Sequence, residues 1–272
     1  MPSICSGVLI MITSELYRKL MIKLTMQNSS WQKVSKWYNK TVGDEGHYYH
    51  QHIIMPNLKR ILNLKENESL LDLACGQGVL ERNMEKKIEY VGIDLASNLI
   101  REANDTKINE KHKFLIADVS KDLPINKMDF DNGAIILALQ NIKKAFGVIK
   151  NFSRHLKKNG KLVIVLNHPI FRIPQHSSWI FEKNKQSRKI DDYMTPLEIG
   201  IKAHPGKREG ENTWSYHYPL SAYSEMLFDN GFVIEKIEEW ISDKKSTGSK
   251  AKTEDRARKE FPLFMAIVAR KN

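Results

Sequence analysis

The chain has 272 residues, of which 41% are hydrophobic and 28% are charged. This composition excludes collagen-like, intrinsically disordered and disulfide-scaffold proteins, and it leaves room for one large domain or two small ones. The two cysteines, Cys5 and Cys75, lie far apart in the sequence, so we expect no zinc or disulfide framework and a cytoplasmic location. No apolar run approaches the roughly 20 residues of a membrane helix, so we expect no membrane span.

The balance of charge is basic, with 43 Lys and Arg against 32 Asp and Glu and a net charge of +11. Such an excess could serve an anionic partner, including RNA, or could be an ordinary solvated surface. The basic residues are scattered, except for a cluster between Lys244 and Lys259.

Residues 1–28 precede the first clear pattern. We expect them to form a disordered or helical arm, or to lie before the true start of the protein. Residues 29–272 are expected to form one domain. Its first helices are predicted over residues 30–38, where Ser29 and Ser30 can cap the first turn, and over residues 47–62.

Short apolar strands then alternate with helical patterns. Strands are predicted over residues 69–74, 90–94, 114–117, 133–138 and 161–166, and helices over residues 79–87, 97–104 and 142–156. Strands that are apolar on both faces and alternate with amphipathic helices indicate an α/β protein with a parallel sheet covered by helices.

The pattern changes after the fifth strand. Residues 168–218 are rich in Pro, His, Trp, Tyr and charge and show no clear period, so we expect an irregular lid or binding insertion. A helix is predicted over residues 220–229. Strands over residues 232–240 and 264–269 follow, joined by the basic cluster without a crossover helix, which favours an antiparallel final pair.

A glycine-rich turn follows the first strand, in Asp72-Leu-Ala-Cys-Gly-Gln-Gly78. Two glycines let the backbone pass close to a ligand, and a helix begins just after them. The dinucleotide fingerprint wants a third glycine where this chain has Glu81, which disfavours NAD and FAD because a carboxylate would occupy the turn. Asp94 ends the second strand and could accept hydrogen bonds from ribose hydroxyls, and Asp118 ends the third and could accept from an adenine amine.

Together these residues resemble the class I S-adenosylmethionine-dependent methyltransferases. Gly92-Ile-Asp94 and Ala117-Asp118-Val119 look like the second and third motifs of that family, and Leu156 to Val165 looks like its fifth-strand signature. The order of segments resembles the bacterial type-11 and ubiquinone-biosynthesis kind. The resemblance implies a Rossmann-like, seven-stranded, mostly parallel sheet with an antiparallel last strand, helices on both faces and a lid insertion after strand five.

The resemblance also implies roles for particular residues. The backbone of Gly76 and Gly78 should pass against the methionine part of S-adenosylmethionine, and Asp72 should orient that turn or reach the amine. Asp94 should hold the ribose and Asp118 the adenine. The other cofactor contacts that we expect are Tyr38, Ala74, Leu95, Val119 and Leu137.

The segment from Gly46 to His52 contains three histidines and two tyrosines. His47 and His50 are three apart on the predicted helix, but two ligands without a carboxylate make a weak metal site, so we expect no metal. Ordinary packing is one interpretation of the segment. Contact with substrate or cofactor is the other, and it makes Tyr49 and His50 candidates for acceptor binding.

The segment after strand five supplies the remaining candidates. We expect an acceptor pocket formed by Asn167, Arg172, Trp179 and Trp214, with packing of the insertion's own core as the alternative. Arg172 could pair with a carboxylate or phosphate. If the acceptor has a proton to lose, His168 is our first candidate for the general base and His217 our second.

We therefore expect an S-adenosylmethionine-dependent methyltransferase that acts on O, N or C of a small molecule by direct displacement and releases S-adenosylhomocysteine. The absence of an Asn-Pro-Pro-Tyr/Phe motif after strand four argues weakly against amide and adenine-amine acceptors. The alternatives are an RNA methyltransferase, favoured by the basic charge, and a non-catalytic cofactor-binding protein.

Overall fold

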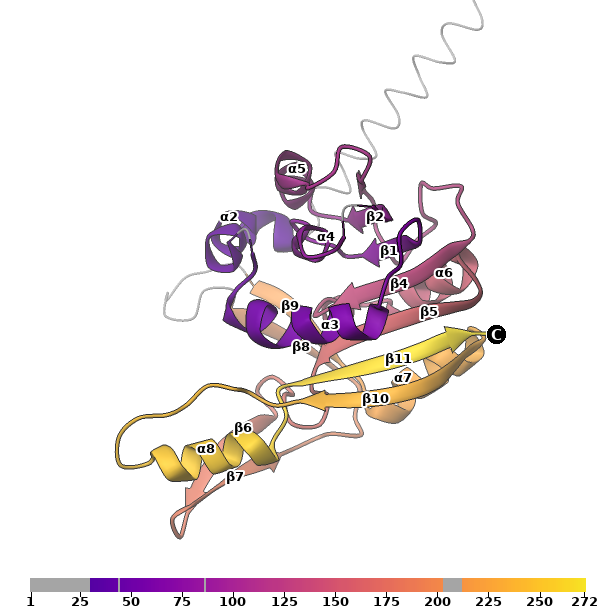
Figure 1. Ribbon diagram of the computed structural model, residues 1–272. Helices are drawn as coiled ribbons and strands as arrows, with labels where there is room; N and C mark the ends of the chain where they lie inside the picture. Colours follow the sequence, from indigo (N-terminus) through magenta and orange to yellow (C-terminus); the bar gives the residue numbers. More distant parts are fainter. Residues whose placement is uncertain (1–29, 44, 86, 203–211) are drawn as a thin grey trace, which may run out of the picture.

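The structure is a computed structural model that describes residues 30–43, 45–85, 87–202 and 212–272, so the expected arm over 1–28 lies outside the described residues (Figure 1). Its centre is a sheet of seven strands in the order β10-β11-β5-β4-β1-β2-β3. These strands are β1 (Ser69–Leu73), β2 (Glu89–Asp94), β3 (Lys113–Ile116), β4 (Phe130–Ile136), β5 (Leu156–Asn167), β10 (Phe232–Trp240) and β11 (Phe264–Lys271).

The strand directions confirm the predicted α/β class. The neighbours from β3 through β5 pair in parallel, whereas β11 runs antiparallel to both β5 and β10. Every residue of β1 is buried, as expected for a central strand with helices on both faces. The last strand of the chain is therefore the antiparallel one.

Helices cover both faces of the sheet. They are α2 (Ser30–Val42), the π-helical turn η1 (His50–Ile54), α3 (Met55–Leu62), α4 (Val79–Arg82), α5 (Ser97–Thr106), the 3-10 turn η2 (Leu139–Asn141), α6 (Ala145–His155), α7 (Leu220–Asp229) and α8 (Ala251–Glu260). Leu58 of α3, Leu80 of α4 and Ala103 of α5 belong to the core on one face. Phe152 of α6 and Leu227 of α7 belong to the core on the other.

The insertion after β5 is regular, which corrects the prediction of a structureless segment. It forms two antiparallel hairpins, β6 (Ser177–Glu182) with β7 (Lys185–Ile190) and β8 (Leu197–Lys202) with β9 (Asn212–His217). β6, β7 and β8 bury few side chains, and the side chains that β9 buries, Thr213, Ser215 and His217, are polar. Because backbone pairing rather than an apolar face holds them together, their sequences carry no clear alternation.

The connection between β10 and β11 contains helix α8, which the sequence interpretation missed. Only Ala257 of this helix is buried, so it has no apolar stripe to detect. Arg258 pairs with Asp255 at 3.0 Å inside the helix. Arg256 donates to the carbonyl of Gln186 on β7, which fastens α8 to the first hairpin. Among the described residues, no helix is long and apolar enough to cross a membrane.

Candidate active site

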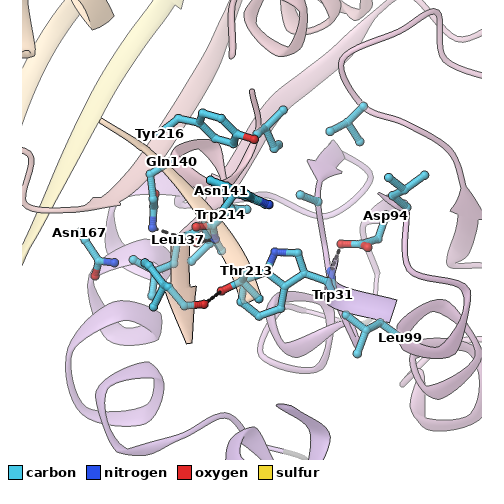
Figure 2. A pocket seen from close by; sticks show the side chains of 18 of the residues that line it. Trp31, Asp94, Leu99, Leu137, Gln140, Asn141, Asn167, Thr213, Trp214 and Tyr216 are labelled. Atoms are coloured by element: carbon cyan, nitrogen blue, oxygen red, sulfur yellow. Dashed lines mark hydrogen bonds between the residues drawn. The ribbon is translucent and has the colours of Figure 1, made fainter. Parts of the chain in front are cut away.

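A cavity of about 1160 Å³ opens where the parallel strands end. Open α/β sheets bind ligands at this edge, because the loops that follow the strands converge there. The segments after β1, β2, β3 and β4 contribute Gly76, Asp94, Asp118 and Leu137 to its wall. Helix α2 and the hairpin β8–β9 supply further walls through Trp31, Trp37, Thr213, Trp214 and Tyr216 (Figure 2).

The glycine turn at the end of β1 is built from left-handed backbone. Ala74, Gly76 and Gly78 have φ values of 59°, 57° and 81°. A Cβ at Gly78 would lie 3.0 Å from Cζ of Phe114, so a side chain would press on the core there. Glycine suits such a position because it adopts positive φ without steric cost.

Asp94 joins this turn to the end of β2. Its Oδ2 accepts the amide of Gly76 at 3.0 Å, and its Oδ1 accepts the amide of Ala96 at 2.8 Å. Burial raises the pKa of Asp94 above its ordinary value, while these backbone bonds act in the opposite direction. Each carboxylate oxygen keeps a lone pair for another donor, so Asp94 can still accept hydrogen bonds from a diol at the cavity wall.

Asp118 lies in the loop after β3. Its Oδ1 accepts the hydroxyl of Ser120 at 2.7 Å and the amide of Ser120 at 3.0 Å. Burial acts to raise the pKa of Asp118, but the bonds from Ser120 and Lys121 outweigh it and hold the pKa below its ordinary value. Asn151 of α6 fixes the loop from behind by donating to the carbonyls of Val119 and Lys121.

Asp72 does not line the main cavity. It is buried and accepts the hydroxyl of Tyr90 at 2.5 Å. Burial raises its pKa to about 7, and the nearby charge of Asp94 adds to the effect. Asp72 instead borders a small adjoining cavity together with His50 and Gly76. This placement suits the orienting role that the resemblance implies.

The segment after β4 contributes two amides that sequence reasoning missed. Leu137 has a φ of 52°, which is rare for a residue with a branched side chain. Gln140 and Asn141 both donate to its carbonyl, at 3.0 and 3.1 Å. The buried Oε1 of Gln140 has no partner among the described residues, so a ligand donor could satisfy it. Strained backbone of this kind clusters at functional sites.

The two predicted general bases are not placed at the cavity. His168 is 1% exposed, its Nε2 lies 2.7 Å from Oε1 of Glu239, and its Nδ1 accepts the amide of Ile170. His217 is also buried, and its Nε2 lies 2.7 Å from the carbonyl of Tyr193. Neither ring lines the wall, so the structure does not bring these two candidates to the cavity. Because Nδ1 of His168 accepts an N–H, its proton sits on Nε2 and the ring is neutral.

The expected acceptor residues divide into two groups. Tyr49, His50, Asn167, Arg172 and Trp214 line the cavity. Trp179 does not; its ring instead lies 5.5 Å from Cζ of Arg172 and packs edge-on against Phe261. Burial next to His47 lowers the pKa of His50 to about 3, which leaves the ring neutral.

Most of the remaining cofactor candidates also lie at the cavity. Ala74, Leu95 and Val119 line the cavity, and Gly78 lies behind the turn. Tyr38 lies on α2, but its side chain is outside the part of the chain that the structure describes. No group of three or more possible metal ligands occurs among the described residues.

Glu81 corrects one step of the argument against NAD. Its carboxylate is fully buried and points away from the ligand turn, where Oε1 lies 2.6 Å from Nδ1 of His112 and accepts the amide of Ile108. It therefore does not block the turn. The acidic residues Asp72, Asp94 and Asp118 instead suit a nucleoside that carries a cationic amine.

Comparison with known proteins matches residues 71–164 to the family described as Methyltransferase domain. An uncharacterized methyltransferase of Schizosaccharomyces pombe is 33% identical over 113 residues, 39% of this chain and 42% of that protein. A demethylmenaquinone methyltransferase of Lactococcus lactis is 29% identical over 125 residues, 43% of this chain and 49% of that protein. The chain thus spans less than half the length of these two relatives.

Solved structures share the fold. An S-adenosylmethionine-dependent methyltransferase from Mesorhizobium loti superposes with a TM-score of 0.62 at 22% identity, over 79% of this chain and 96% of that one. A [4+2]-cyclase, SpnF, superposes with a TM-score of 0.60 at 15% identity, over 89% and 94%. One fold thus supports more than one reaction. Residues 71–164 thus match the family described as Methyltransferase domain, and the chain has the fold of solved structures described as S-adenosylmethionine-dependent methyltransferases.

Proposed function

We propose that this protein is an S-adenosylmethionine-dependent methyltransferase that moves a methyl group to O, N or C of a small molecule. The observation that carries the proposal is one cavity with acidic cofactor residues on one side and an aromatic, basic wall on the other. In the view of Figure 2, Asp94 and Asn167 lie on opposite sides, with Trp31, Thr213 and Trp214 between them. The volume, about 1160 Å³, exceeds the range of roughly 300–1,000 Å³ for one ligand, which leaves room for two.

The cofactor half of the proposal assigns Asp94 to the ribose and Asp118 to the adenine. Asp94 has lone pairs free beside a rigid turn, and Asp118 is held by Ser120. Asp72 and His50, which border the small cavity next to Gly76, are assigned to the amine end of the cofactor. The bound cofactor supplies a methyl group on a positively charged sulfur.

The chain's own contribution is positioning and exclusion of water. Direct displacement at a methyl carbon requires donor and acceptor in line, and holding them there supplies much of the acceleration. Trp31, Trp37 and Trp214 enclose the cavity with apolar rings. The histidines on the wall, His47 and His50, are kept neutral by burial, which lowers the pKa of both.

The first experiment is calorimetric titration of the full chain with S-adenosylhomocysteine, with NADH and ATP as controls. Selective micromolar binding is the expected result. Transfer of labelled methyl from S-adenosylmethionine to a panel of small molecules then tests turnover. Binding without turnover on any acceptor would favour the non-catalytic alternative, and no binding by folded protein would overturn the proposal.

An RNA acceptor is the rival outcome, and the described basic cluster supports it only weakly. Lys244 lies 4.5 Å from the ring of Tyr48, and Lys250 lies 4.8 Å from the ring of Phe181, so both stack on aromatic groups of this chain. An RNA enzyme predicts steeply salt-dependent binding that is lost when Lys244, Lys245, Lys250 and Lys252 are changed to Gln. Retained small-molecule turnover in that variant excludes the RNA assignment.

A further inference from the structure

Arg172 is a half-buried cation on the wall of the cavity, with no counterion among the described residues, and its Cζ lies 5.5 Å from the ring of Trp179. It lies in the turn after β5, where its amide donates to the carbonyl of His168 at 2.8 Å. Its Nε is buried and has no hydrogen-bond partner, and no described carboxylate pairs with its guanidinium. Burial, with a smaller effect of Arg188, lowers the pKa of Arg172 to about 10.

The other cations nearby are paired or exposed to solvent: Lys144 and Lys202, which also line the cavity, are exposed. Arg188, whose Cζ lies 5.0 Å from the ring of Trp179, donates to the carbonyl of Phe171 at 2.8 Å and the hydroxyl of Ser177 at 2.6 Å. On the cavity wall, Lys121 pairs with Asp118 at 3.3 Å and Lys143 with Glu198 at 2.8 Å. Arg172, which lines the cavity, differs because its Nε is buried without an acceptor, and a buried donor without an acceptor is costly.

His168 stabilises the turn that carries Arg172. Nδ1 of His168 accepts the amide of Ile170 at 3.2 Å, and Nε2 lies 2.7 Å from Oε1 of Glu239. The ring of Phe171 packs on His168, with centroids 4.7 Å apart. The backbone of the turn that carries Arg172 is therefore held in place.

The wall beside Arg172 is aromatic and apolar. Tyr49, Leu263 and Phe264 line the same cavity, and the rings of Tyr49 and Phe264 meet edge to face with centroids 5.7 Å apart. Asn167, at the end of β5, adds an amide to this wall. Flat apolar surface around one fixed cation is complementary to an anionic group on an aromatic body.

We propose that Arg172 binds the carboxylate of the methyl acceptor, and that the acceptor is an aromatic carboxylic acid. This inference rests on the proposed function and names the substrate class of the same site. A guanidinium suits a carboxylate because its donors match the two oxygens in one plane. The carboxylate of the cofactor is a less suitable occupant, because its amine end is assigned to Asp72, which borders the small adjoining cavity beside Gly76 and not the main one.

The experiment is a ligand-detected NMR titration of the full chain saturated with S-adenosylhomocysteine, using benzoate, benzamide and phenyl phosphate as probes. Benzoate is expected to bind at least about tenfold tighter than the neutral benzamide. Arg172→Gln should remove this preference, and Arg172→Lys should restore part of it, while S-adenosylhomocysteine affinity stays within about twofold. Arg154→Gln removes an arginine that pairs with Asp122 outside the cavity, so it should change nothing.

Three outcomes would overturn the inference. Equal affinities for benzoate and benzamide would mean that Arg172 does not distinguish an anionic ligand from a neutral one. Benzoate binding that survives Arg172→Gln would place the anion elsewhere, and a preference for phenyl phosphate would reassign the site to phosphates. Failure of S-adenosylhomocysteine itself to bind would instead overturn the proposed function, so the two failures are distinguishable.

Discussion

Oδ2 of Asp94 accepts the backbone amide of Gly76 at 3.0 Å, so the acid that ends β2 holds the glycine turn that ends β1. One carboxylate thereby fixes the turn and keeps lone pairs at the cavity wall. The two ends of neighbouring parallel strands are stabilised as one unit before any ligand arrives.

Asp94→Asn should weaken S-adenosylhomocysteine binding by at least about tenfold, because one carboxylate oxygen becomes a donor and can no longer accept from both the backbone and a ribose. Calorimetric titration measures the loss. Asp105→Asn changes an exposed acid on α5 and is the matched control. Equal affinities of the Asp94 variant and the parent protein would remove Asp94 from the ribose site.

His168→Ala should lower the free energy of unfolding by about 2 kcal/mol, because it leaves the amide of Ile170 and the carboxylate of Glu239 without their partner. It should raise the acceptor KM more than it lowers kcat, since the turn that carries Arg172 loosens. The shape of the pH–rate profile should not change. Loss of its acidic limb with KM unaffected would restore His168 as a general base.

His50 makes stability depend on pH. Burial lowers the pKa of His50 to about 3 in the folded state, against about 6.5 in the unfolded state. Below about pH 6.5 the unfolded state therefore binds a proton that the folded state does not. The free energy of unfolding consequently falls as the pH is lowered from 6.5, by up to about 1.4 kcal/mol per pH unit. Asp72 acts oppositely, because its folded-state pKa of about 7 makes the native state bind a proton that the unfolded state releases above about pH 3.8.

Chemical denaturation at pH 7.5, 6.5 and 5.5, with and without the His50 side chain, measures the effect of His50. Between pH 6.5 and 5.5, the free energy of unfolding of the parent protein should fall by up to about 1.4 kcal/mol more than that of His50→Asn. His52→Asn, at an exposed neighbour, is the control. Identical slopes for all three proteins would show that His50 titrates normally in the native state.

Gly147→Ala should destabilise the protein although alanine favours helices. A Cβ there would lie 2.4 Å from the carbonyl oxygen of Ser120, and backbone cannot move aside cheaply. We expect a net loss of about 1–3 kcal/mol, because this overlap outweighs the roughly 1 kcal/mol gained from helix propensity. Thermal unfolding measures it, with Gly200→Ala as control, since its nearest described neighbour is Trp214 at 3.7 Å. A stabilised Gly147 variant would contradict the packing of α6 on the Asp118 loop.

Much of the site followed from strand order alone. Asp72, Gly76, Asp94 and Asp118 come at or just after the ends of buried parallel strands, and those ends meet at one edge of the sheet. Their proximity therefore required no knowledge of side-chain packing. The same logic could not show that Asp72 turns toward Tyr90 and away from the main cavity.

Side-chain direction was the part that sequence patterns could not supply. His168 follows the fifth strand as a catalytic residue would, yet a partner on β10, Glu239, draws its ring into the protein. Glu81 likewise follows the glycine turn but pairs with His112, which lies before β3. Gln140 carried no motif, and only the fold of η2 places its amide on the cavity.

Hydrophobic periodicity and the alternation of strands and helices along the chain can be read in the sequence, and they predicted the parallel sheet and the edge at which Asp94 and Asp118 lie. The three-dimensional structure was needed to show which polar groups line the cavity, that the insertion forms hairpins and that no described carboxylate pairs with Arg172. Those features depend on contacts between residues distant in the sequence, and no local pattern specifies such contacts.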